Sequence, residues 1–287
     1  MVSLDEILAG RECVVVPGAY DALSARLAAR AGACAVYMTG FGVAGAAFAV
    51  PDIGLVTATE MIERVRALAR AATPVPLIAD GDNGHGGPLN AARLTVAYEQ
   101  AGAACIQLED QVSPKRCGHM EGKEVVPLSE AAAKIRAAAG ARSTPSFKIM
   151  ARTDARATHG LDEALRRGEA FLKAGADILF IEAPRDEDEL ATVARNFGGV
   201  PLVANLVEDG KTPMLSPKVL EEMGYAIALY PISALLGAAR RLEDIYAALL
   251  DGRATGERMS FESYNAVVRL PEFLALADML KDDPCQD

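Results

Sequence analysis

Residues 100–108, QAGAACIQL, hold the pattern that decides the fold, because similar stretches recur along the 287-residue chain. They are RAGACAVYM at 30–38, KAGADILFI at 173–181 and EMGYAIALY at 222–230. In each stretch a helix-like segment ends at a glycine and a short apolar run follows. Glycine at that place suits the left-handed residue that closes a helix. The recurrence therefore indicates a repeated helix–strand unit rather than repeated domains.

Short apolar runs alternate with amphipathic stretches of about a dozen residues, a pattern typical of βα units and a parallel sheet. Eight runs are predicted as strands: Val14–Pro17, Ala35–Met38, Leu77–Ala79, Cys105–Leu108, Phe147–Ala151, Ile178–Ile181, Leu202–Ala204 and Ile227–Leu229. The helices predicted between them include 21–30, Thr57–Ala72, Leu89–Gln100, Leu128–Ala139 and Leu161–Lys173. The glycine-rich stretch Thr39–Pro51 is predicted as a long loop. Eight such units predict a single (β/α)8 TIM barrel domain over residues 1–287.

The end of the chain is predicted to be a helical extension, residues 255–287. From about Ser260 onward, apolar residues such as Phe261, Tyr264 and Leu270 recur at helical spacing. An apolar helix outside a completed barrel needs a covering surface, so we expect the extension to pack on a neighbouring subunit.

Composition excludes several classes of partner. The net charge of -10 argues against nucleic acid and anionic membranes, which bind clustered Lys and Arg. The first ten residues lack the apolar core of a signal peptide, and no run of 18 apolar residues follows, so a cytoplasmic protein is expected. The five cysteines show no zinc-site spacing; Cys13, Cys34 and Cys105 are expected in the core, and Cys285 in the tail.

Acidic side chains gather where predicted strands end. Asp80 and Asp82 follow strand three, and Glu109 follows strand four. The carboxyl ends of barrel strands build the active site, so these carboxylates should meet. Carboxylates so close repel one another unless a cation or proton is shared, and Mg²⁺, or Mn²⁺ in its place, suits such oxygen ligands. The alternative is that they are ordinary polar strand ends.

The loop after strand four carries a thiol among cations. Cys117 lies between Arg116 and His119, with Lys115 one residue further back. Neighbouring cations lower a thiol pKa from about 8.5, so Cys117 is a candidate general acid or nucleophile. The alternative is an exposed cysteine without a role.

Arg152, at the end of strand five, has two readings. Its guanidinium is well shaped to bind a substrate carboxylate. It would otherwise form an ion pair with Glu182 at the rim of the barrel.

Taken together, these motifs resemble the isocitrate lyase and phosphoenolpyruvate mutase superfamily, and within it the short lyases such as methylisocitrate and 2,3-dimethylmalate lyase. The resemblance covers about residues 10–275. It rests on YMTGFGVAG, PDIGL, DGDNGHGG, LEDQVSPKRCGH, MARTDA, IEAP, ANLVEDGKTP and ALYPISA.

The resemblance implies a role for each matching position. Asp80 would bind Mg²⁺ directly, whereas Asp52, Asp82 and Glu109 would reach it mostly through water. The remaining positions belong to substrate and proton chemistry. Thr39, Gly40, Phe41 and Arg152 would hold the 2-oxo-acid end, Tyr37 would lie near the reacting oxygen, Cys117 would handle the proton, His119 would support its loop, and Asp52, Glu182 and Asn205 would line the pocket.

The implied activity is cleavage of a 2-hydroxy di- or tricarboxylate into pyruvate, or a similar 2-oxo acid, and a carboxylic acid. The resemblance also implies a homotetramer. One departure bears on the substrate: Leu235, Leu236 and Gly237 follow YPISA, where methylisocitrate lyases typically place an arginine. This favours a dicarboxylate such as a 2-alkylmalate. The alternatives are oxaloacetate hydrolysis or decarboxylation, phosphonate chemistry on the same scaffold, and a binding protein without activity.

Overall fold

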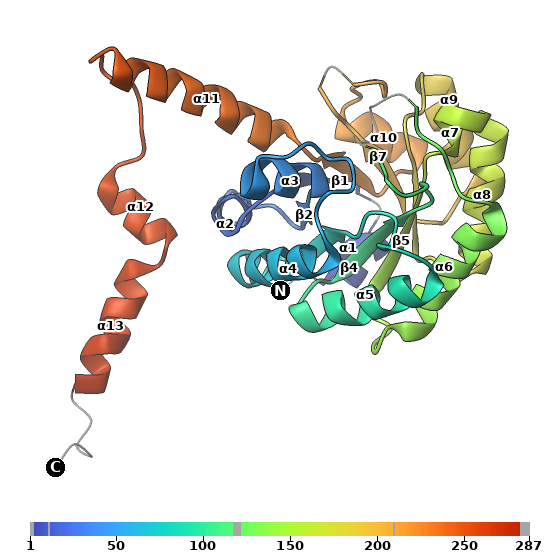
Figure 1. Cartoon of the computed structure of the whole chain (residues 1–287), viewed down its shortest axis with the longest axis horizontal. Coiled ribbons are helices and arrows are strands. Elements are labelled where there is room, and N and C mark those ends of the chain that lie inside the picture. Colours follow the sequence, from blue (N-terminus) through green and yellow to red (C-terminus); the bar gives the residue numbers. More distant parts are fainter. Residues whose placement is uncertain (1–2, 11, 117–121, 209, 282–287) are drawn as a thin grey trace. The chain divides into compact units, whose positions relative to one another are not determined.

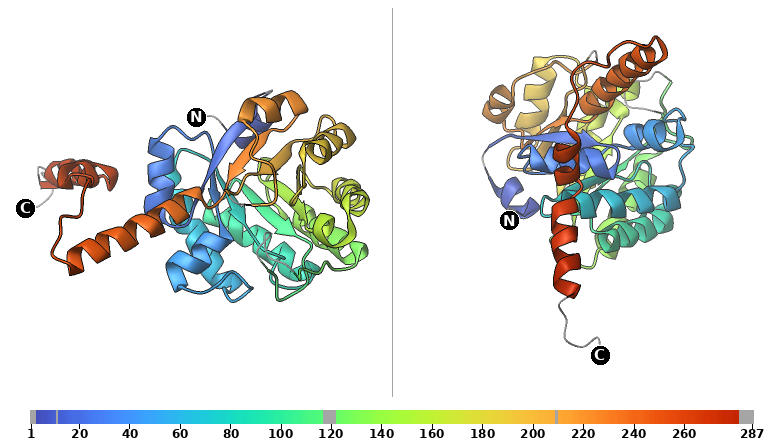
Figure 2. Two further views of the ribbon diagram at one scale, coloured as in Figure 1. Left: turned by 90° about the horizontal axis from the view of Figure 1, so that it is seen from above. Right: turned by 90° about the vertical axis from the view of Figure 1, so that its left-hand side faces the viewer.

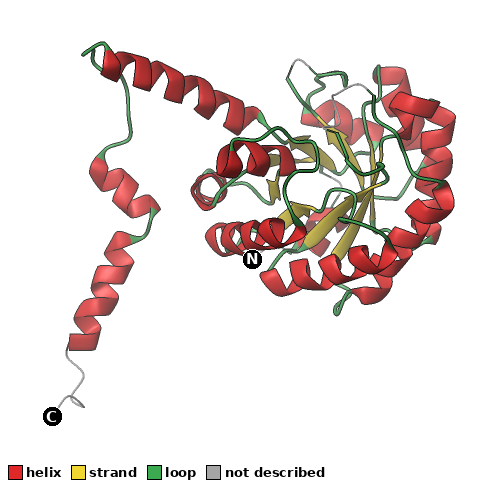
Figure 3. Cartoon of the chain, in the orientation of Figure 1, coloured by secondary structure: helices red, strands yellow, loops and turns green. Residues whose placement is uncertain are grey.

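The computed structural model describes residues 3–10, 12–116, 122–208 and 210–281. By their internal contacts they form two compact units, residues 1–236 and 237–287. The first contains every strand, and the second contains helices (Figure 3).

The first unit is a closed barrel of eight parallel strands in sequence order. Pairing of the first strand with the last, with Val16 opposite Leu229, closes it. The strands are β1 (Val14–Ala19), β2 (Val36–Met38), β3 (Leu77–Asp80), β4 (Cys105–Glu109), β5 (Lys148–Thr153), β6 (Ile178–Ile181), β7 (Leu202–Asn205) and β8 (Ile227–Tyr230). The predicted (β/α)8 barrel is confirmed.

Helices alternate with the strands, and several of them lie on the outside of the barrel (Figure 1). They are α1 (Leu4–Ala9), α2 (Ala22–Arg30), α3 (Gly40–Phe48), α4 (Ala58–Ala72), α5 (Pro88–Ala101), α6 (Leu128–Ala141), α7 (Ala155–His159), α8 (Leu161–Lys173), α9 (Glu187–Asn196), α10 (Pro217–Met223) and α11 (Ser233–Leu250). Two further views show the same ring of helices around the strands (Figure 2).

The glycine of each recurring stretch has the predicted left-handed backbone. Gly32, Gly102, Gly175 and Gly224 have φ of 95°, 98°, 104° and 104°. A side chain is rarely tolerated at such angles. These residues turn the chain from helix to strand four times, which confirms the repeated unit.

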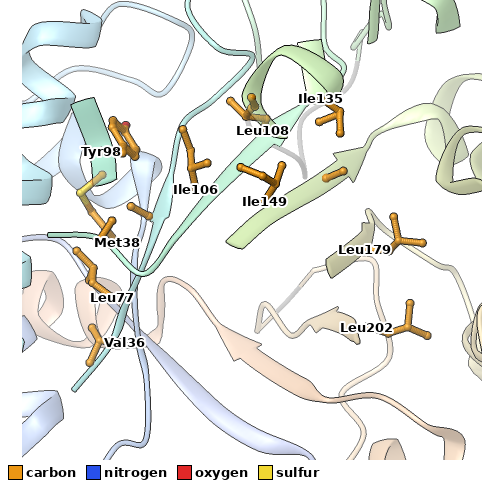
Figure 4. Packing of buried hydrophobic residues seen from close by; sticks show 14 of the residues in the cluster. Val36, Met38, Leu77, Tyr98, Ile106, Leu108, Ile135, Ile149, Leu179 and Leu202 are labelled. Carbon is orange, nitrogen blue, oxygen red and sulfur yellow. The ribbon is translucent and has the colours of Figure 1, made fainter. Parts of the chain in front are cut away.

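The strands separate two apolar cores because successive side chains point to opposite faces. On β4, Ile106 and Leu108 join the core between barrel and helices (Figure 4), whereas Cys105 joins the core inside the barrel. Leu4 and Ile7 of α1 pack in this inner core. Two polar residues of β4, Gln107 and Glu109, point to the inside of the barrel like Cys105.

The stretch predicted as the loop Thr39–Pro51 contains helix α3, so that prediction was wrong. The Thr39 side chain caps the helix by accepting a hydrogen bond from the Gly42 backbone N–H, at 3.3 Å. A Cβ at Gly42 would lie 2.8 Å from that of Tyr20, so the glycine permits close packing. Tertiary packing here outweighs the weak helix propensity of glycine.

Gly18 of β1 passes the end of β8 without room for a side chain. A Cβ there would lie 2.0 Å from the carbonyl oxygen of Pro231. We expect Gly18→Ala to lower the free energy of unfolding by about 3 kcal/mol or more, the upper end of the range for overpacking. Gly140→Ala, in α6 with open space around it, should instead raise it by about 0.5–1 kcal/mol. Urea denaturation measures both; equal stability of the two variants would contradict the expectation.

The cysteines are only partly as predicted. Cys13 and Cys105 are buried, as expected, but Cys34 is exposed. β2 begins at Val36, so Cys34 lies in the turn before the strand rather than in the core. Cys285 lies outside the described residues.

In the second unit, the end of α11 is followed by α12 (Phe261–Val267) and α13 (Leu270–Lys281). The three helices expose apolar side chains, and α13 buries none of its residues. Phe261 is 83% and Met279 72% exposed. The predicted packing on a neighbouring subunit stays a prediction. Across the described residues, no helix combines the length and apolar character needed to span a membrane.

Candidate active site

Polar side chains that point into the barrel meet at the carboxyl ends of the strands and form one pocket. It is lined by Tyr37, Thr39, Phe41, Asp52, Asp80, Glu109, Lys115, Arg116, Arg152, Phe180, Asn205, Val207, Leu229, Pro231 and Ile232. Most of the residues predicted for the site are therefore brought together. Three further predicted residues contact the lining: Gly40 contacts Asp80, Asp82 contacts Lys115, and Glu182 contacts Asn205.

Three hydrogen-bond donors hold the Asp80 carboxylate. Its Oδ1 accepts hydrogen bonds from the Asp82 backbone N–H, at 3.0 Å, and from Gln107 Nε2, at 3.1 Å. Its Oδ2 accepts one from the Gly40 N–H at 3.1 Å, at the start of α3. A Cβ at Gly40 would lie 2.7 Å from Oδ2, so only glycine allows this approach. Burial, and then the Asp82 carboxylate, raise the pKa of Asp80 to about 6.

Lys115 lies within the carboxylate cluster, which the sequence did not indicate. Its buried Nζ is 2.7 Å from Asp82 Oδ1 and also forms an ion pair with Asp52. His85 lies beside the same cluster, with Nε2 3.7 Å from Asp82 Oδ2. One ammonium group thus offsets part of the negative charge here.

Glu109 retains acceptor capacity that no side chain uses. Its Oε1 is buried and has no hydrogen-bond partner, and burial raises its pKa well above the ordinary value. Among the described residues, no three His, Cys, Asp or Glu side chains are close enough together to bind a metal ion directly. A cation that keeps several waters, as Mg²⁺ does, fits this set of spaced oxygen donors.

Arg152 is buried rather than placed at the rim. Two of its nitrogens, Nε and Nη2, donate to Asp154 at 3.0 Å each. Nε also lies 3.4 Å from Glu109 Oε2 and 3.7 Å from Glu182 Oε2, and the guanidinium stacks over Phe180 with its central carbon 5.2 Å from the ring centroid. The predicted ion pair with Glu182 is therefore present, but its predicted place at the rim is wrong, because the guanidinium is buried among three carboxylates and lines the pocket.

Asp154 is the residue that orients Arg152, and sequence reasoning gave it no role. It is fully buried and also accepts from Lys123 Nζ at 2.6 Å. Burial raises its pKa, but Arg152 and Lys123 outweigh that effect and bring it to about 2. The neighbouring Asp110 pairs with Arg167, at 3.0 Å, and so belongs to the support of the barrel.

Tyr37 faces the pocket from β2 and is almost fully buried. Its hydroxyl donates to Gln107 Oε1 at 2.8 Å. Burial raises the pKa of Tyr37 well above its ordinary value, so the phenol keeps its proton at neutral pH.

Asn205 lines the pocket, and the buried Glu182 lies next to it. Asn205 Nδ2 donates to Glu182 Oε2 at 3.2 Å, while Asn205 Oδ1 is buried without a hydrogen-bond partner. Cys117 and His119 lie outside the described residues. Gln107 was missed, although its position two residues before Glu109 on an apolar strand was a signal.

Comparison with known proteins agrees with this geometry. The family described as phosphoenolpyruvate phosphomutase matches residues 4–250. The chain belongs to this family. It is 46% identical over 269 residues to a 2,3-dimethylmalate lyase of Eubacterium barkeri, covering 92% of each protein.

Two further proteins similar to this chain have other activities in their names. A 2-methylisocitrate lyase of Bacillus subtilis (strain 168) is 42% identical over 252 residues, which cover 85% of this chain and 82% of that protein. The structure of an oxaloacetate acetylhydrolase with 3,3-difluorooxalacetate superposes with a TM-score of 0.93 at 31% identity, covering 98% of this chain and 97% of that one. The lyase names confirm the predicted family and its lyase branch.

Proposed function

We propose that the protein is a Mg²⁺-dependent lyase that cleaves a 2-hydroxy dicarboxylate, of the 2-alkylmalate or 2,3-dimethylmalate type, between carbons two and three. The products are pyruvate or a similar 2-oxo acid and a second carboxylic acid. One observation carries the proposal: buried Arg152 and the carboxylate cluster around Asp80 line the same pocket. The pocket therefore holds a cation for a substrate carboxylate beside oxygen ligands for a metal ion.

The chain's own residues account for substrate binding and proton transfer. Arg152 binds a carboxylate of the substrate, and the N-terminus of α3 beside Phe41, which lines the pocket, favours an anion. A carboxylate of the cluster around Asp80 takes the proton of the 2-hydroxyl, and Glu109 Oε1 has an unused acceptor site there. The hydroxyl oxygen becomes the carbonyl of the 2-oxo acid, the bond between carbons two and three breaks, and its electron pair passes to carbon three. The Cys117 thiol donates a separate proton to carbon three.

Mg²⁺, on which this family generally depends, would be held by Asp80, with Asp52, Asp82 and Glu109 reaching it through water. Bound there, it would supply Lewis-acid polarisation of the oxygens of the forming 2-oxo acid.

The lining of the pocket supports a dicarboxylate with alkyl substituents. Phe180, Val207, Leu229, Pro231 and Ile232 supply an apolar wall. The cations among the lining residues are Lys115, Arg116 and Arg152, and Lys115 already pairs with Asp52 and Asp82. The pocket therefore offers more apolar surface for an alkyl substituent than cations for a third carboxylate.

Hydrolysis of oxaloacetate is the second candidate, supported by the close structural likeness to oxaloacetate acetylhydrolase. A product assay separates the two. With Mg²⁺, the protein is offered 2,3-dimethylmalate, 2-methylisocitrate, isocitrate and oxaloacetate separately, and 2-oxo acid and oxalate are measured. Pyruvate or a similar 2-oxo acid from the malate-type compound supports the proposal. Oxalate from oxaloacetate alone would replace it with the hydrolase, and no product from any compound would direct attention to phosphonates.

Binding of Mg²⁺ should depend on pH through Asp80. Its pKa is raised to about 6, so the metal-free protein holds a proton there below that pH, and a metal must displace it. We expect the apparent Kd for Mg²⁺ to rise by up to about tenfold for each pH unit below 6 and to level off above it. Isothermal titration calorimetry at pH 5, 6 and 7.5 measures this; equal Kd values at pH 5 and 7.5 would contradict it.

We also propose a cytoplasmic homotetramer that uses the extension 255–287 as an interface. The exposed apolar side chains of α12 and α13 support this. Sedimentation equilibrium tests it, and a monomer at micromolar concentration would remove it.

A further inference from the structure

Gln107 connects two residues that line the pocket, Tyr37 and Asp80. It is fully buried on β4, opposite Asp80 in the register of β3 and β4. Its amide lies between the Tyr37 hydroxyl, 2.8 Å from Oε1, and Asp80 Oδ1, 3.1 Å from Nε2. A neutral amide here cannot pass a proton from one to the other, so its effect must come from the direction of its two hydrogen bonds.

Chemistry fixes that direction. An ionised carboxylate only accepts hydrogen bonds, so Gln107 must present its NH₂ group to Asp80. The amide oxygen then faces Tyr37, and an amide oxygen only accepts, so the phenol must donate its single proton to it. Tyr37 is left with lone pairs and no proton for a ligand.

We propose that Gln107 is a positioning residue that makes Tyr37 a hydrogen-bond acceptor for the 2-hydroxyl group of the substrate, which rests on the proposed lyase function. Carboxylate and ketone oxygens carry no hydrogen, so they have nothing to donate to Tyr37. The hydroxyl is the one donor of a 2-hydroxy dicarboxylate. Tyr37 therefore selects the hydroxy acid and fixes where its hydroxyl lies relative to Arg152. The 2-oxo product loses this hydrogen bond, which favours its release.

The test compares ligands that differ by one hydroxyl. Calorimetry at saturating Mg²⁺ gives the Kd of malate and of succinate, its deoxy analogue, for the wild type, three single variants and the double variant Tyr37→Phe with Gln107→Met. Tyr37→Phe removes the acceptor, and Gln107→Met removes both hydrogen bonds of the amide. Gln107→Glu keeps an oxygen that accepts from Tyr37 whether or not the new carboxyl is protonated. Thermal melting checks that each variant is folded.

We expect the preference for malate over succinate to fall about fivefold to tenfold in Tyr37→Phe and in Gln107→Met, as for a lost hydrogen bond. The double variant should lose no more than Tyr37→Phe alone, because both act through one hydroxyl. Gln107→Glu should keep the preference. Should Gln107→Met fail to fold, Tyr37→Phe and Gln107→Glu still give the comparison.

Equal weakening of malate and succinate in Tyr37→Phe would show that Tyr37 does not single out the hydroxyl, and would overturn the inference. Loss of the preference in Gln107→Glu as large as in Gln107→Met would overturn the role of the amide oxygen. Because binding is measured, the result does not depend on turnover. A protein inactive toward every lyase substrate but with the expected ligand preferences would refute the proposed function, and it would leave Gln107 as a residue that orients Tyr37 toward the hydroxyl of a bound hydroxy acid.

Discussion

Arg152→Met is expected to lower kcat/KM about a hundredfold to a thousandfold, as for loss of a buried donor to reacting oxygens. It should also lower the free energy of unfolding by about 3–5 kcal/mol. The loss of stability follows from the three carboxylates around the guanidinium, Glu109, Asp154 and Glu182. Without the cation, buried negative charges face one another with little solvation.

Arg152→Lys separates the two effects. Lysine keeps the positive charge, so most of the stability should return. It lacks the planar group that donates through two nitrogens to Asp154 and that can bind a carboxylate with two parallel hydrogen bonds, so kcat/KM should stay low. Steady-state kinetics and urea denaturation measure the two. A methionine variant with wild-type stability and turnover would show that Arg152 is neither a clamp nor a counter-ion.

Cys117→Ser is expected to lower kcat about a hundredfold to ten-thousandfold, the usual contribution of a general acid. A serine hydroxyl is a far weaker acid than a thiol with cationic neighbours, so the proton reaches carbon three more slowly. The Kd for Mg²⁺ should not change, since the proposed ligands are carboxylates. Cys117 itself lies outside the described residues, but its neighbour Arg116 lines the pocket.

Cys34→Ser is the matched control, because Cys34 is exposed in the turn before β2, at the opposite end of the strand from the pocket. It should keep the full kcat. Turnover at the wild-type rate in a well-folded Cys117→Ser variant would mean that another group protonates carbon three.

The sequence by itself determined the barrel and the end at which its chemistry lies. The recurring glycine before alternate strands and the apolar periodicity are local signals, set by φ and by burial, so they can be read along the chain. The predicted strand ends also placed Asp80, Glu109 and Arg152 together at the carboxyl end of the barrel. Motif similarity then indicated the lyase branch, which the relatives confirm.

Tertiary structure alone decided how those residues are paired. The sequence predicted that Arg152 binds a substrate carboxylate or pairs with Glu182; the Glu182 pair forms, but the folded chain also directs two nitrogens of Arg152 to Asp154, which the sequence did not indicate. It likewise places Lys115 among the carboxylates. Helix α3 forms where a loop was predicted, because packing outweighs the helix propensity of its glycines. Such pairings depend on distances between residues far apart in the chain, as for Tyr37 and Gln107, and local sequence patterns carry no information about those distances.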